Sequence, residues 1–273
     1  MFSLPTIVSL LGAVLSSSIM IIAIKNITFY RSSTSTWRKT DYHLLFLRNV
    51  LDLCACALST FYYIILALDT RIDYSFIFAT LATTITDARA YLAVFIALER
   101  CIAIIFPVFF YKNRERINIK VVIAVISIIG LAGDYRMFIM CDVRFPLNQE
   151  CTTFICAATC CYQSYLIVNM VTYSLLKVIF TTMLCIKLLQ IKITKNSNVT
   201  SANIMCLSDG FIGVLFQNVP TILESRKLVD FDNKGPIAGV LRSAGLLIET
   251  MIVFELMSKK KVQTERISKV ISK

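Results

Sequence analysis

The sequence predicts an all-α protein, a bundle of seven transmembrane helices with the amino terminus outside the cell and the carboxyl terminus in the cytoplasm. Three observations support this prediction. The chain has 273 residues, of which 57% are hydrophobic and only 16% charged, whereas a soluble domain contains about 25% charged residues. The apolar residues come in blocks of ~20, the length that an α-helix needs to cross the ~30 Å hydrocarbon core of a bilayer. Lysine and arginine gather in alternate loops, which is how membrane topology is encoded.

Seven apolar segments and a basic tail account for nearly the whole chain. The predicted spans, which make up a seven-transmembrane domain at 1–257, are residues 4–24, 43–68, 75–98, 121–140, 164–186, 204–223 and 236–257, and the tail is 258–273. The first segment lacks a positively charged start and ends in Lys25 instead of a small-residue cleavage site. We therefore interpret it as a retained helix and not as a signal peptide. The fourth span is purely apolar only as far as Gly133, because Asp134 and Arg136 follow.

The distribution of basic residues predicts the orientation of the chain. The loops after the first, third and fifth spans, together with the tail, hold 18 Lys and Arg residues, against 5 on the opposite side. Short cytoplasmic loops are enriched in Lys and Arg, so we expect the amino terminus outside and the tail inside. Two glycosylation sequons, at Asn26 and Asn198, fall on the predicted cytoplasmic side, and we expect them to be chance matches.

The tail and the net charge have a membrane explanation. The net charge of +11 arises from the loops and the tail, so the lipid bilayer and not nucleic acid is the expected partner. Ile267, Val270 and Ile271 are spaced to suit a short helix lying on the anionic leaflet. A positively charged anchor for the last span explains the same residues.

Few residues offer catalytic chemistry. The sequence contains a single histidine, His43, and it has neither a CxxC pair nor a nucleophile-elbow motif. We therefore expect neither an enzyme nor a metal or organic cofactor.

Four charged residues are predicted to meet near the middle of the membrane. Asp52, Arg89, Lys177 and Glu249 come out at a similar depth when residues are counted from the ends of their spans. Intramembrane charges are costly and almost always face the bundle interior and pair. We expect a buried polar network, with Asp52–Arg89 as its first pair. The network either fixes the register of the helices or takes part in a switch.

A second group lies above or beside this layer. Asp87, Tyr91 and Arg242 are placed where side chains could reach a ligand cavity that opens outward. Packing is an alternative role for the aromatic residue.

The predicted outer loop before the fifth span is rich in cysteine. It carries Cys141 and Cys151, followed by Cys156, Cys160 and Cys161. Because this loop faces an oxidising compartment, we expect a disulfide, and a local Cys141–Cys151 bridge is the first candidate.

The end of the third span carries the most specific sequence signal. It reads Ala97-Leu98-Glu99-Arg100-Cys101-Ile102-Ala103-Ile104-Ile105-Phe106-Pro107. This stretch resembles the end of the third helix in rhodopsin-like receptors, where an acidic-Arg pair is followed by Ala-Ile and then Pro. The fourth span has no Trp, however, the seventh lacks Asn-Pro-x-x-Tyr, and the sixth lacks an aromatic-Trp-x-Pro sequence.

With these departures the chain is most similar to the nematode serpentine chemoreceptors of class BC (Srbc). The resemblance implies a chemosensory receptor that detects a small chemical in the outer half of the bundle. It also implies activation of a heterotrimeric G protein at the inner face, with coupling through Glu99, Arg100 and Pro107. It places the protein in the plasma membrane, in a sensory cilium.

Two other functions fit a multi-pass membrane protein. A transporter or channel would use the intramembrane charges as an ion path, although the sequence lacks the internal repeat that many secondary transporters show. A seven-pass chemoreceptor channel of the insect kind would have the inverted topology, which the distribution of Lys and Arg opposes.

Overall fold

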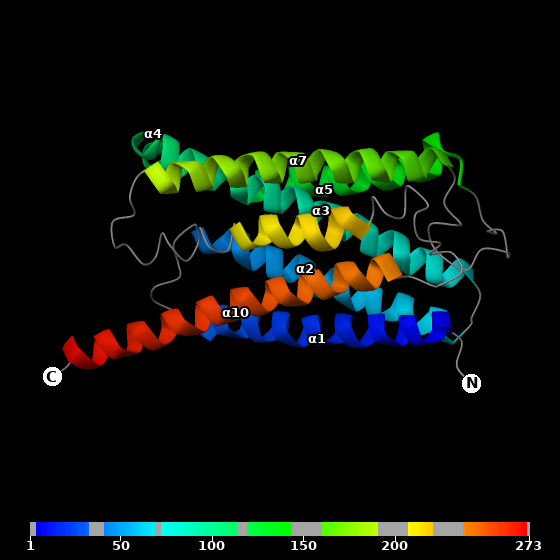
Figure 1. The fold of residues 1–273 in the computed structure, drawn as a ribbon, viewed down its shortest axis with the longest axis horizontal. Coiled ribbons are helices and arrows are strands. Elements are labelled where there is room, and N and C mark those ends of the chain that lie inside the picture. Colours follow the sequence, from blue (N-terminus) through cyan, green and yellow to red (C-terminus); the bar gives the residue numbers. More distant parts are fainter. Residues whose placement is uncertain are drawn as a thin grey trace.

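The computed structural model describes residues 4–32, 41–68, 72–113, 119–143, 160–190, 207–220 and 237–271. Within these ranges the regular secondary structure is helical throughout, as predicted. The long helices lie alongside one another in one bundle, and the first residues of α1 and the last residues of α10 lie at opposite ends of it (Figure 1).

The described helices overlap the predicted spans, and α1, α3 and α10 extend well past them. They are α1 (Leu4–Ser32), α2 (Asp41–Ala67), α3 (Ile72–Ile105), α4 (Pro107–Asn113), α5 (Ile119–Tyr135), η2 (Arg136–Met140), α7 (Cys160–Gln190), η3 (Val214–Asn218) and α10 (Ile237–Ile271). The π-helix η3 forms the middle of a helical segment at 207–220. Residues 258–271 continue α10 without a break, so the described part of the tail is an extension of the last helix and not a separate one.

Five of these helices are long and apolar enough to cross a membrane. The stretches are Thr6–Thr28, His43–Ala67, Lys120–Met140, Ser164–Lys187 and Ile237–Glu255. The helix α3 has 34 residues but carries Asp87 and Arg89 near its middle, and the segment 207–220 contains a shorter apolar helix. The fold therefore provides at least five membrane-length helices, in the places where the sequence predicts spans.

The helix α3 lies at the centre of the packing. It contacts α2, α5 and α7, whereas α1 packs against α2 and α10. Leu92 on α3 is fully buried and packs in a cluster with Leu44 of α2 and Val122 of α5. The outward faces of α1, α5 and α7 carry exposed Leu, Ile and Val side chains, as expected of helices that face lipid.

Tyr63 of α2 fills the space between α1 and α10. A Cβ atom added at Gly12 would lie 2.9 Å from the Tyr63 ring, and one at Gly239 would lie 2.6 Å from the Tyr63 hydroxyl oxygen. Small residues allow transmembrane helices to approach closely. Glycine at these two positions therefore lets α1 and α10 close on one aromatic ring.

The carboxyl-terminal end of η2 is fixed by its backbone and by a disulfide. Asp142 takes a left-handed conformation with φ 52°, and the Val143 N–H donates to the Met137 carbonyl oxygen at 3.3 Å. This turn carries Val143 into a buried cluster with Phe76, Met137 and Tyr162. The ends of α3, η2 and α7 thereby share one small apolar core.

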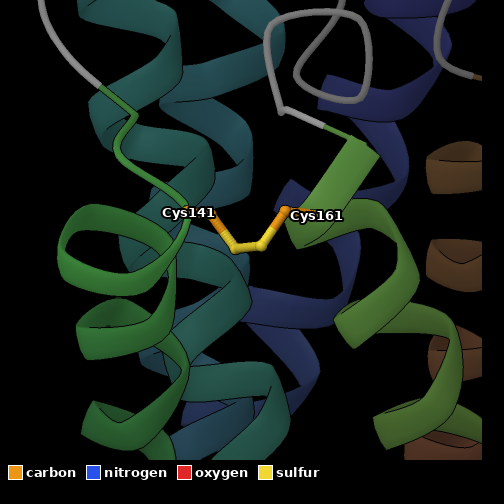
Figure 2. The surroundings of a disulfide bond; sticks show 2 residues. All are labelled: Cys141 and Cys161. Atoms are coloured by element: carbon orange, nitrogen blue, oxygen red, sulfur yellow. A yellow bond between two sulfur atoms is a disulfide. The ribbon is translucent and has the colours of Figure 1, made fainter.

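The predicted Cys141–Cys151 bridge is wrong, because Cys141 bonds to Cys161. Figure 2 shows the bond joining the end of η2 to the first turn of α7, with a Cα–Cα distance of 5.6 Å. Cys151 and Cys156 lie outside the described residues. The prediction of a bridge within the loop failed because α7 begins beside the end of η2. This arrangement brings two cysteines that are 20 residues apart in the sequence within bonding distance.

Loss of this disulfide is expected to destabilise the end of the bundle where η2 meets α7. Closing a loop of this length removes conformational entropy from the unfolded chain, worth about 3 kcal/mol. We expect Cys141→Ser and Cys161→Ser each to lower the melting temperature of the detergent-solubilised protein, and the double variant to lower it no further than either single one. Cys54→Ser, which changes a free and exposed cysteine, is the control. If all four variants melted at the temperature of the wild type, the disulfide would contribute nothing to stability.

Candidate functional site: a buried chain of ion pairs

Six charged side chains from five segments of the chain meet inside the bundle. They are Arg48 and Asp52 on α2, Arg89 on α3, Lys177 on α7, Asp209 in the segment 207–220, and Glu249 on α10. Each of the six residues is at most 7% exposed. The set contains three cations and three anions, so its formal charge is zero.

The first half of the chain joins α2, α3 and α10. Arg89 donates from Nε to Asp52 Oδ1 and from Nη2 to Glu249 Oε2, the second contact at 2.7 Å. Arg89 is 2% exposed, among the most buried large side chains described. A guanidinium presents several N–H donors in one plane, which allows it to hold two carboxylates at once.

The second half of the chain joins α2, α7 and the segment 207–220. Arg48 pairs with Glu249 Oε1 and also, at 3.4 Å, with Asp209 Oδ1. Lys177 Nζ donates to the same Asp209 oxygen at 2.6 Å. The full order is therefore Asp52, Arg89, Glu249, Arg48, Asp209 and Lys177, with the sign of the charge alternating at every step.

Alternation explains how six charges are tolerated inside the bundle. An isolated ion in an apolar medium carries a large desolvation cost, and a buried pair is tolerated when geometry and further hydrogen bonds compensate for it. Here the four central members, Arg89, Glu249, Arg48 and Asp209, each touch two partners of opposite sign. Each of the five contacts in the ion-pair chain joins a cation to an anion.

The four residues that the sequence predicted for a buried polar network all belong to the ion-pair chain. The structure brings Asp52 and Arg89 together directly, whereas Lys177 binds Asp209 and none of the predicted acids. Arg48 and Asp209 were missed. Both lie within predicted spans but nearer to the span ends than the predicted layer, and the prediction did not include them. Long side chains at Arg48 and Lys177 bridge that difference in depth, so every charge within a span should have been included.

The structure also accounts for one glycosylation sequon. Asn26 on α1 is fully buried, and its Nδ2 donates to Asn49 Oδ1 on α2 at 3.2 Å. An amide that packs between two helices is closed to a glycosyltransferase. The second sequon, at Asn198, lies outside the described residues.

A second polar group lies between α3 and α7. The Tyr91 hydroxyl donates to Asn169 Oδ1 at 2.6 Å, and Asn169 Nδ2 donates to Asp87 Oδ2 at 3.1 Å. Arg242 on α10 interacts electrostatically with Asp87 and contacts the Met170 sulfur at 3.9 Å. The structure thus brings together the three residues predicted here. Asn169 was missed because a lone amide in an apolar span gives no charge signal.

The polar interruption of the fourth predicted span is absorbed by neighbouring helices. Asp134 accepts a 2.7 Å hydrogen bond from the Thr84 hydroxyl. The Arg136 guanidinium lies 4.9 Å from the centre of the Tyr165 ring, a distance at which a cation is attracted to the ring face. The helix therefore continues through both polar residues, with Asp134 near the end of α5 and Arg136 as the first residue of η2.

One face of α7 connects the second polar group with the ion-pair chain. Tyr165, Asn169, Tyr173 and Lys177 recur at every fourth residue, so they lie in one row along the helix. Tyr173 meets Tyr91 edge-on with ring centroids 6.0 Å apart, and Lys177 binds Asp209. The row runs from the aromatic and amide contacts to the charged ones.

At the other end of α3 the residues predicted for coupling lie close together. Glu99 is buried and interacts electrostatically with Arg100, while the Cys101 thiol donates to the Phe180 carbonyl oxygen at 2.9 Å. Pro107 is the first residue of α4, a position where its missing N–H is not needed. Phe109 in α4 is 64% exposed. The structure therefore places a short helix with an exposed apolar side chain directly after Glu99 and Arg100.

These features define a multi-pass integral membrane protein with a helical bundle and a charged interior. Among the described residues, no cluster of His, Cys, Asp and Glu could hold a metal ion. Residues 1–261 match the family model described as serpentine type 7TM GPCR chemoreceptor Srbc, and the chain belongs to that family. No curated protein matches it.

Proposed function

We propose that the protein is a chemosensory receptor that binds a small chemical in the outer half of its bundle and activates a heterotrimeric G protein at its inner face. The observation that carries this proposal is the match to a chemoreceptor family over residues 1–261. The ion-pair chain and the two groups at opposite ends of α3 support it. A plasma-membrane location in a sensory cilium belongs to the same proposal.

Seven spans with the amino terminus outside form the proposed topology. Five membrane-length helices, together with α3 and the segment 207–220, give seven crossings. An odd number of crossings agrees with the opposite positions of the start of α1 and the end of α10 (Figure 1). The excess of Lys and Arg in alternate loops supports the orientation.

The proposed ligand contacts are Asp87, Tyr91, Arg242 and Asn169. Asp87 and Asn169 are buried, and Tyr91 is half-buried, on facing sides of α3 and α7. A ligand that takes over the hydrogen bonds of Asn169 would break its present bonds to Asp87 and Tyr91. Such a ligand therefore changes how the two helices are joined, and differential binding of this kind is what shifts a conformational equilibrium.

The proposed G-protein contacts lie at the inner end of α3 and on α4. Arg100 is half-buried beside the Glu99 carboxylate, so a change in helix position can release it towards a partner. Figure 1 shows α4 at the same end of the bundle as the last turns of α7. Pro107 is the first residue of α4, so it sets where the exposed side chains of α4 lie.

The function can be tested in transfected cells with an epitope tag at each terminus. We expect the amino-terminal tag to be stained on intact cells and the carboxyl-terminal tag only after permeabilisation. We also expect one or more compounds of a chemical panel to give a second-messenger response that requires a co-expressed Gα subunit.

Two outcomes would favour another function. Staining of the carboxyl-terminal tag on intact cells would indicate an inverted channel. A compound-dependent ion current that persists without the Gα subunit would indicate a channel or transporter that uses the buried charges.

A further inference from the structure

The ion-pair chain can break into two parts at any of its contacts, but only some of these breaks leave both parts without a net charge. It has five contacts between six groups of alternating sign. Breaking Asp52–Arg89, Arg48–Glu249 or Lys177–Asp209 leaves one part positive and the other negative. Breaking Arg89–Glu249 or Arg48–Asp209 leaves two neutral parts. An uncompensated charge inside a bundle is costly, so movement within this chain is expected at one of these two contacts.

Helix membership decides between the two contacts. Separation at Arg89–Glu249 would place Asp52 in one part and Arg48 in the other, although both lie on α2, four residues apart. A rigid helix cannot belong to both parts. Separation at Arg48–Asp209 divides whole helices, with α2, α3 and α10 on one side and α7 and the segment 207–220 on the other.

The lengths of the contacts agree with this choice. Arg48 and Asp209 lie 3.4 Å apart, whereas Arg89–Glu249 measures 2.7 Å and Lys177–Asp209 measures 2.6 Å. After separation Arg48 keeps Glu249 and Asp209 keeps Lys177, so no member of the chain loses its last partner of opposite charge.

We infer that the bundle has two conformations and that the Arg48–Asp209 contact breaks in the transition between them. In the resting state Arg48 holds Glu249 and Asp209 together, and in the active state it holds Glu249 alone. The helix α7 and the segment 207–220 then move as one neutral unit, kept together by Lys177 and Asp209. This inference rests on the proposed receptor function and adds to it the place at which the bundle opens.

Packing supports the unit and gives it a pivot. A Cβ atom added at Gly210 would lie 2.9 Å from the Thr181 Cγ2 atom, which shows how closely the segment 207–220 approaches α7 beside the ion pair. On the other side, a Cβ at Gly245 of α10 would lie 2.9 Å from the Phe216 Cγ atom. Phe216 is about two helical turns from Asp209, so this contact can persist while the Asp209 end of the segment moves.

The row of side chains on α7 supplies the connection to the proposed ligand contacts. Asn169 holds Asp87 and Tyr91, and Lys177 holds Asp209 two turns further along the same helix. A ligand that releases Asn169 therefore acts on Lys177 through one rigid element.

Two charge-matched double variants test the inference. Arg48→Met with Glu249→Gln removes the Arg48–Glu249 pair, here called the linking pair, and leaves the Asp52–Arg89 and Lys177–Asp209 pairs in place. Asp52→Asn with Arg89→Met removes the terminal pair and leaves the link in place. Each variant removes one buried cation and one buried anion, so their general cost is similar. Arg48→Lys is a milder third variant, because one ammonium group lacks the planar fork that holds two carboxylates.

The readout is the distance between spin labels in the purified protein in lipid nanodiscs. Labels on a genetically encoded ketone amino acid at positions 54 and 211 report α2 against the segment 207–220. Labels at positions 186 and 211 report α7 against the same segment. The native residues, Cys54, Ile186 and Phe211, are all exposed.

We expect the linking-pair variant to add a longer population to the 54–211 distances and to leave the 186–211 distances unchanged. The Arg48→Lys variant should show the same longer population at a lower fraction, and the terminal-pair variant should match the wild type. Unchanged 54–211 distances in both Arg48 variants, or equal shifts in both label pairs, would overturn the inference. This measurement needs neither ligand nor G protein, so a failed signalling assay would reject the receptor function without touching this result.

Discussion

Replacing Arg89 alone by methionine is expected to remove most of the protein from the cell surface. Arg89 holds Asp52 and Glu249, so its loss leaves Asp52 without its partner in the ion-pair chain, inside the bundle. Removing one partner of a buried pair costs about 3–5 kcal/mol, a large part of the stability of a typical domain. The change should appear as a several-fold loss of surface staining and as a lower melting temperature in detergent.

Two controls separate lost charge balance from lost packing. Asp52→Asn combined with Arg89→Met restores neutrality and should recover much of the surface staining, because Glu249 keeps Arg48. Lys187→Met removes a cation from an exposed position of α7 and should behave like the wild type. Full surface staining of the Arg89→Met protein would show that the ion-pair chain does not hold the bundle together.

Replacing Arg100 by alanine is expected to abolish G-protein activation while surface expression stays at the wild-type level. Arg100 lies near the carboxyl-terminal end of α3 and is not one of the six members of the ion-pair chain, so its loss leaves those ion pairs intact. It does remove the cation that neighbours the buried Glu99 at the proposed docking face. Second-messenger output per surface receptor is the quantity to measure.

The control for this change is Arg136→Ala. It removes the same residue type from the opposite end of the bundle, where the side chain lies over Tyr165. Output from this control should remain near the wild-type value. Normal output from the Arg100→Ala receptor would remove Arg100 from the coupling mechanism.

Much of the fold could be predicted because the membrane dictates simple rules. Segment length and apolar composition indicated where along the chain the long helices lie, since a helix must satisfy its own backbone in lipid. Helix ends were less accurate, and α10 extends to Ile271 well past the last apolar residue of the predicted span. Hydropathy marks where lipid ends and does not mark where a helix ends.

The site was predicted in part, and the misses have physical causes. The rule that intramembrane charges pair identified Asp52 and Arg89, but a search for charges at one common depth did not include Arg48 and Asp209. Backbone depth is a poor guide for arginine and lysine, whose long side chains reach a charge one or two turns away. The disulfide was mispredicted because its partner, Cys161, depends on how α7 starts beside η2, and the order of residues alone carries no such information.

Guanine-nucleotide exchange on a purified heterotrimeric G protein tests the receptor function most directly. The receptor would be placed in nanodiscs and exposed to a panel of small organic amines, acids, alcohols and ketones, with the Arg100→Ala protein in parallel. A chemoreceptor that couples through Arg100 is expected to accelerate exchange with at least one compound, and the variant should not. A compound that instead drives ion flux through G-protein-free liposomes, equally in wild type and variant, would contradict receptor function and establish a channel or transporter.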